Sequence, residues 1–138
     1  MDFSQEYGPY APPDASPSYH HYMNEAGKSM QTVHPVIRAS AWEPISHYYL
    51  EWERGFKELT QNSYNQHDTE FLVERLTSRR DEEVGKIIQE AREFNEREGD
   101  NIKQDLAQER QDEFMAQKIR NMALQRQRMR QRDHDRGR

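Results

Sequence analysis

DEEVGKIIQEAREFNEREGDNIKQDLAQERQDEFMAQKIRNMALQRQRMRQR, residues 81–132, is the stretch that decides the fold. It is rich in charged residues and glutamine. Its few apolar residues recur at spacings of three and four, which places them on one side of an α-helix. The first apolar run is Val84, Ile87, Ala91 and Phe94, and the second is Met115, Ile119, Met122 and Met129. The pattern predicts an all-α, elongated helical protein of coiled-coil character.

The two runs share one register but are separated by polar residues. The intervening positions hold Glu98, Asn101, Asp105, Gln108 and Asp112. Gly99 followed by Asp100 has the form of a helix stop and a helix start. The chain can therefore turn back at Gly99, or it can continue as a rod or kinked rod, because one glycine costs only ~1 kcal/mol relative to alanine. We favour the rod, since the residues that would hold a hairpin together are sparse.

Composition limits the size of any core. Leu, Ile, Val and Phe make up 21 of the 138 residues, below the ~20% typical of self-sufficient globular chains. There is no cysteine, so disulfides and thiolate metal sites are excluded. Neither a secretory signal nor an apolar run of membrane-spanning length is present. We expect a soluble intracellular protein, cytoplasmic by default, with an organelle or the nucleus left open.

Residues 1–39 are dominated by Gly, Pro, Ser and Tyr and show no helical or strand period. We expect this segment to be disordered when free. It is then either a solvated tail or a segment that wraps a partner with its aromatic side chains, which are Phe3, Tyr7, Tyr10, Tyr19 and Tyr22. The neighbouring His20 and His21 lack the further ligands that a zinc site needs, so no metal is expected.

The cleanest apolar stripe lies in the helix predicted over residues 40–61. Ser40 to Glu43 has the form of a capping box, and Pro44 then falls in the first turn. The stripe consists of Ile45, Tyr49, Trp52, Phe56 and Leu59, spaced by four, three, four and three. It either docks on a partner or packs on the next helix of the chain, and these two readings stay open.

A loop over residues 61–67 and an N-cap at Asp68 are predicted to precede the next helix. We expect helices over 68–98 and 100–132, separate or joined, with 133–138 as a basic tail. Phe71, Leu72, Val73 and Leu76 are the expected mates of the aromatic stripe in a helical hairpin. Val84, Ile87, Ala91 and Phe94 are expected to make a second partner contact.

Charge is unevenly distributed. Residues 118–138 carry eight basic and two acidic side chains, so they are +6 while the other 117 residues are −11 within a total of −5. Arg126, Arg128, Arg130 and Arg132 form a candidate anion-binding site for nucleic acid, anionic lipid or an acidic protein groove. Residues 118–138 contain no aromatic side chain for base stacking, so any contact of this arginine tail with nucleic acid would be electrostatic.

KIIQEAREFNEREGDNIKQDL, residues 86–106, and Trp52 within EWERGFKELT, residues 51–60, resemble clathrin light chains. The resemblance implies a disordered N-terminal segment and an acidic helix that lies along a larger protein. The chain departs from that family because it is short and lacks the C-terminal region and the acidic N-terminal motif expected there.

The sequence lacks the features of an enzyme. It has six glycines, no phosphate-cradling loop, no nucleophile motif and little apolar material to shield a pocket from water. We therefore expect a non-enzymatic accessory subunit, without cofactor or metal, that docks along a larger protein complex. The alternative is an RNA- or DNA-associated protein bound through the arginine tail. Homo-oligomerisation is the third hypothesis, since the 115–129 seam favours it although the acidic interruption opposes it.

Overall fold

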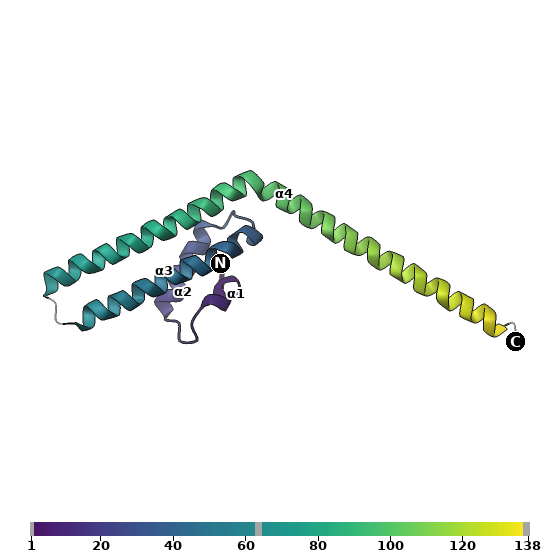
Figure 1. Ribbon diagram of the computed structural model, residues 1–138, viewed down its shortest axis with the longest axis horizontal. Coiled ribbons are helices and arrows are strands. Elements are labelled where there is room, and N and C mark those ends of the chain that lie inside the picture. The colour runs from purple at the N-terminus through teal and green to yellow at the C-terminus, as the bar shows by residue number, and fades with distance from the viewer. Residues whose placement is uncertain (1, 63–64, 137–138) are drawn as a thin grey trace. The chain divides into compact units, whose positions relative to one another are not determined.

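The protein is all-α, as the sequence predicts. The computed structural model describes residues 2–62 and 65–136, with side chains as far as Arg132 in α4, and within these residues there is no strand. In chain order the elements are α1 (Ser4–Tyr7), the 3-10 helix η1 (Gly8–Tyr10), α2 (Pro17–Ser29), α3 (Pro35–Gln61) and α4 (Gln66–Arg136) (Figure 1). The chain divides into two compact units, Met1–Gly99 and Asp100–Arg138, which are described separately below.

The N-terminal segment is folded, which corrects the expectation of disorder over residues 1–39. Ser16 caps α2 by accepting a hydrogen bond at Oγ from the Tyr19 backbone N–H at 3.1 Å. Pro17 occupies the first turn of that helix, where a missing N–H costs nothing. A Ser-Pro pair that starts a helix was therefore present in the sequence.

α3 begins five residues earlier than predicted. His34 is the N-cap, accepting at Nδ1 from the Val36 N–H at 3.2 Å, and Pro35 is the first helical residue. The hydroxyl of Ser40 bonds back to the carbonyl oxygen of Ile37 at 2.7 Å, so the expected capping box is wrong. Pro44 consequently lies inside the helix and removes one backbone donor there.

The start of α4 also differs from the prediction. Asn65 caps the helix, because its Oδ1 accepts from the Asp68 N–H at 2.8 Å. Its Nδ2 donates to the Asp68 carboxylate at 2.9 Å, so the Asn65 side chain bonds both the backbone and the side chain of Asp68. Asp68 thus assists the cap from within the first turn. Ser63 and Tyr64, which belong to the loop predicted over 61–67, lie outside the described residues.

The helical residues of α4 include the polar gap at 77–83 and also Gly99. The boundary between the two compact units falls directly after Gly99, where the sequence suggests an interruption. Whether the helix is a straight or a kinked rod there stays a prediction.

The core of residues 2–99 is aromatic and sulfur-rich. α1, η1 and α2 pack against α3, and the first part of α4 returns beside α3 in the opposite direction (Figure 1). The buried side chains are Phe3, Tyr7, Tyr19, Met23, Ala26, Met30, Val33, Ile37, Ala41, Trp42, Ile45, Tyr49, Val84 and Ala91. Trp42 lies at the centre, with its ring 6.0 Å from Phe3 and 5.7 Å from Tyr7. The N-terminal segment thus supplies the apolar cover that the composition appeared to lack.

Candidate interaction surfaces

The aromatic stripe of α3 divides into a covered half and an exposed half. Ile45 is fully buried, and Tyr49 is 2% exposed with two rings from α2 beside it. The ring of Tyr49 lies 5.5 Å from that of Tyr19 and 5.0 Å from that of Tyr22. The first half of the stripe therefore belongs to the protein's own core.

The second half of the stripe reaches the surface. Trp52 and Leu59 are half-buried, while Phe56 is 36% exposed. Phe56 stacks on Trp52 with ring centroids 5.3 Å apart. The Trp52 indole donates to the hydroxyl of Thr77 at 3.0 Å, which joins α3 to α4 as the predicted hairpin requires. Phe56 is thus the most exposed residue of the stripe.

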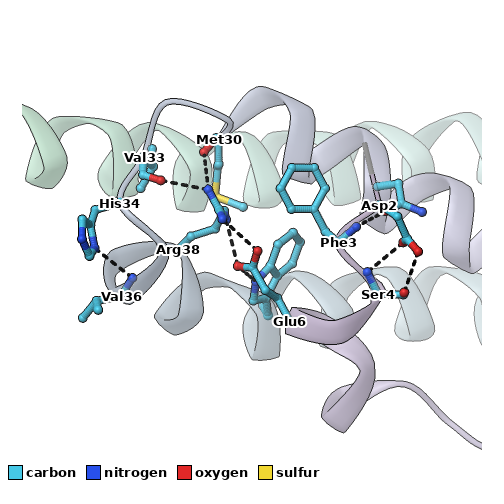
Figure 2. A network of polar contacts seen from close by, with 11 residues as sticks. Asp2, Phe3, Ser4, Glu6, Met30, Val33, His34, Val36 and Arg38 are labelled. Carbon is cyan, nitrogen blue, oxygen red and sulfur yellow. Dashed lines mark hydrogen bonds and ion pairs between the residues drawn. The ribbon is translucent and has the colours of Figure 1, made fainter.

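Arg38 connects the N-terminal segment to α3 (Figure 2). Its Nε and Nη2 donate to the two carboxylate oxygens of Glu6 at 2.9 and 2.8 Å. Its Nη1 donates to the carbonyl oxygens of Val33 and Met30 at 2.9 and 3.3 Å. The Arg38 side chain is buried and that of Glu6 is partly exposed, and the bidentate geometry fixes how the two groups lie. The Arg38 guanidinium holds the pKa of Glu6 below its usual 4.5, and the indole of Trp42, donating at 3.3 Å, acts in the same direction.

Arg80 joins α4 to the rest of the N-terminal unit through aromatic rings. Its guanidinium carbon lies 4.5 Å from the ring centroids of both Tyr22 and Trp52. Burial raises the pKa of Tyr22 to about 12, and the nearby Arg80 charge only partly opposes this. Cation–π contacts of this kind are worth ~0.5–2 kcal/mol, so Arg80 has a structural role in holding α4 against α2 and α3.

The second predicted contact surface is largely covered. Val84 and Ala91 are buried and Ile87 is half-buried, whereas Phe94 remains exposed. Asn95, which follows Phe94 on α4, joins this part of the helix to the start of α3. Its Oδ1 accepts a hydrogen bond from the His34 backbone N–H at 2.9 Å. Val84 and Ala91 are therefore occupied within the chain, and their binding of a partner stays an untested prediction.

A groove opens between α3 and α4 beyond the aromatic core. It has a volume of about 520 Å³ and is lined by Gly55, Glu58, Leu59, Asn62, Leu72, Arg75, Leu76 and Arg79. The backbone of α3 approaches α4 closely at Gly55, where an added Cβ would lie 3.0 Å from Cδ1 of Leu76. Three leucines and two arginines line the groove. Leu59 belongs to the predicted partner-binding stripe, and Leu72 and Leu76 were predicted to pack against that stripe.

In the second compact unit, Asp100–Arg138, the large apolar side chains between residues 114 and 129 are exposed, whereas Ile102 and Leu106 are half-buried. Exposed large apolar residues are Phe114, Met115, Ile119, Met122, Leu124 and Met129. Arg126, Arg128, Arg130 and Arg132 are exposed as well. The predicted anion-binding arginines are thus accessible, and their ligand stays a prediction.

Sequence reasoning missed the polar residues that organise the N-terminal unit. Glu6 and Arg38 are 32 positions apart, and no local spacing connects them. The available signal was weaker: Tyr7, Tyr19 and Tyr22 are the aromatic points of the N-terminal segment, and in the structure they meet rings of the chain's own α3.

Comparisons with family models, curated proteins and solved structures find no match for this chain. Within the part of the chain that the structure describes, no group of three or more His, Asp or Glu side chains is placed to hold a metal ion. Over residues 2–62 and 65–136, no helix has an apolar run long enough for a bilayer crossing.

Proposed function

We propose that this protein is a non-enzymatic helical accessory subunit that docks on a larger protein assembly. The observation that supports this role is the groove between α3 and α4, about 520 Å³ in volume, which is lined by three leucines and by polar side chains. Concave surfaces that combine apolar side chains with a few polar groups are typical places for a partner to bind.

The groove indicates the chemistry of the partner. Leu59, Leu72 and Leu76 suit apolar side chains, as in the docking of an amphipathic helix into a groove. Arg75 and Arg79 line the same space and favour a carboxylate next to the apolar anchor. Arg79 lies 3.9 Å from Glu51, an exposed pair whose weak attraction leaves the guanidinium free to rearrange.

The test compares two neighbouring substitutions on α4. Leu72→Ala removes a groove residue, whereas Phe71→Ala removes a larger, exposed ring at the adjacent position. Tagged variants are expressed in the native cell, and the proteins that cosediment with them are identified after nuclease treatment. We expect Leu72→Ala to lose a defined set of proteins that Phe71→Ala keeps. Equal retention by both variants contradicts docking through the groove.

Phe56→Ala tests the exposed ring that follows the groove residue Gly55 in sequence, and it is a cleaner variant than Trp52→Ala. Trp52 bonds Thr77 and stacks on Arg80, so its removal also loosens the fold. Phe56 has no such polar partner among the described residues and exposes more of its ring. Thermal unfolding of each variant separates loss of docking from loss of the fold.

A second candidate function is association with RNA or DNA, favoured by the exposed arginines. Residues 118–132 contain six basic and no acidic side chains. Such a segment neutralises phosphates without reading sequence. Deleting residues 126–138 should then abolish a binding that weakens steeply with salt. Binding that survives the deletion excludes this candidate.

A further inference from the structure

The second compact unit has one apolar face without cover. Met115, Ile119, Met122 and Met129 are spaced by four, three and seven, which places them on one side of α4. Ile119 is 62% exposed, and the three methionines are exposed too. Four large apolar side chains in one line on a soluble helix mark an interaction surface.

Charge changes sign along the same helix. Residues 100–117 carry five acidic and two basic side chains, a net −3, whereas residues 118–132 are +6. The register of the apolar face continues with Asp105 and Asp112 on the acidic side and with Arg126 on the basic side. The face is therefore an apolar centre between two ends of opposite charge.

We propose that the occupant of this face is a second copy of the same chain, paired antiparallel over residues 108–132. A helix that is acidic at one end and basic at the other complements itself when it is reversed. The surface is separate from the α3–α4 groove, so this inference does not rest on the proposed docking function.

A parallel pair is disfavoured by the residues of the seam. In parallel register each seam residue meets its own copy, so Asp112 would face Asp112, and Arg126 would face Arg126. Like charges in a seam repel, and neither has an opposite charge directly across. Reversing one helix removes both conflicts, which explains why the acidic interruption does not forbid pairing.

One antiparallel register satisfies the seam best. It sets Ile119 opposite Met122 of the second copy, and Met115 opposite the alkyl stem of Arg126. Met129 then covers Asp112, whose carboxylate already accepts from the Gln108 amide at 3.0 Å. At the rim, Glu109 faces Arg130 of the second copy, and Ala116 faces Ala123. Each contact occurs twice because the pair is symmetric.

The first test measures the mass of the full-length protein by sedimentation equilibrium over a concentration series. We expect a dimer that dissociates on dilution. Ile119→Asp should give a monomer, whereas Phe114→Asp should stay a dimer, because Phe114 is exposed but lies outside the seam. A wild-type monomer at every concentration, or equal behaviour of the two variants, overturns the proposal.

A charge exchange tests the register without removing apolar contacts. Glu109→Arg alone and Arg130→Glu alone should each weaken the dimer severalfold, whereas the double exchange should restore it. A merely structural role for either residue gives no such rescue. Failure of the double exchange to restore the dimer contradicts this register.

The absence of native cysteine makes orientation measurable. Ala116→Cys and Ala123→Cys proteins are mixed and treated with a short bismaleimide. The antiparallel pair predicts crosslinked heterodimer in the mixture and little crosslinking in either protein alone. Crosslinking of each protein with itself indicates parallel pairing and overturns the proposal. A monomer that gains mass only with added nucleic acid also overturns it and favours the arginine-tail function.

Discussion

Residues 2–99 and residues 100–132 both contain apolar side chains at helical spacing, but these side chains are largely buried in the first region and largely exposed in the second. In the first region, Val84 and Ala91 of α4 are buried against the rest of the unit, and in the second, Ile119 and Met122 face solvent in the same register. The difference lies in the cover that the chain supplies. α1, η1 and α2 complete a core in the N-terminal unit, whereas the described residues of the second unit, 100–136, all belong to α4.

The comparison teaches that spacing identifies an apolar face and says nothing about what covers it. The face of residues 84–91 and the face of residues 115–129 look alike as sequence. The chain itself covers Val84 and Ala91, whereas Met115, Ile119, Met122 and Met129 are exposed.

Trp42→Ala should cause the largest loss of stability. The Trp42 side chain of α3 is fully buried, with the rings of Phe3 and Tyr7 beside it. Its removal therefore leaves a cavity at the centre of the N-terminal unit. Buried tryptophan-to-alanine substitutions typically lower the free energy of unfolding by about 3–5 kcal/mol. Chemical denaturation followed by fluorescence of the remaining Trp52 measures the change. A loss no larger than that of Phe56→Ala would show that the core is not closed as described.

Gly27→Ala should be the next most damaging change. An added Cβ would lie 2.3 Å from Cδ2 of the buried Phe3 ring, so the N-terminal segment must move. Overpacking of this kind costs about 1–3 kcal/mol. Gly85→Ala is the matched control, since it is also helical but has no atom within 4 Å of the added Cβ.

Gly85→Ala should stabilise α4 by roughly 0.5–1 kcal/mol through helix propensity alone. Opposite signs for the two glycine substitutions in thermal denaturation are therefore expected. Equal, small effects would indicate that Phe3 does not pack against α2 in solution.

Mild acid should weaken the N-terminal unit through Glu6. Its pKa is held below 4.5 in the folded state, chiefly by hydrogen bonds from Arg38. Folding therefore favours the ionised form, so the contribution is complete above pH 4.5 and is lost as pH falls through the folded pKa. Denaturation midpoints measured from pH 6 downward should decline less in Glu6→Gln than in the wild type, though the variant is less stable at pH 6. Parallel declines would exclude a role for this pair.

Helical class and the registers of α3 and α4 could be predicted because apolar spacing is local information. The fold of residues 2–34 could not. A composition test that counts Leu, Ile, Val and Phe overlooks a core made largely of Tyr7, Tyr19, Trp42, Met23 and Met30. The start of α3 was missed because a histidine cap before Pro35 gives a weaker signal than a Ser–Glu box. The groove depends on how two helices diverge, which no single spacing encodes.

Phe114→Ala should have the smallest effect and tests the exposed side of the contrast. Phe114 is 68% exposed, so it loses little burial on truncation, and surface substitutions usually change stability by less than ~0.5 kcal/mol. Alanine also favours the helix slightly over phenylalanine, which offsets part of any loss. Thermal unfolding monitored by far-ultraviolet circular dichroism should therefore coincide with that of the wild type. A clear drop would mean that Phe114 is covered in solution, and the apolar seam would then have to be wider than the line from Met115 to Met129.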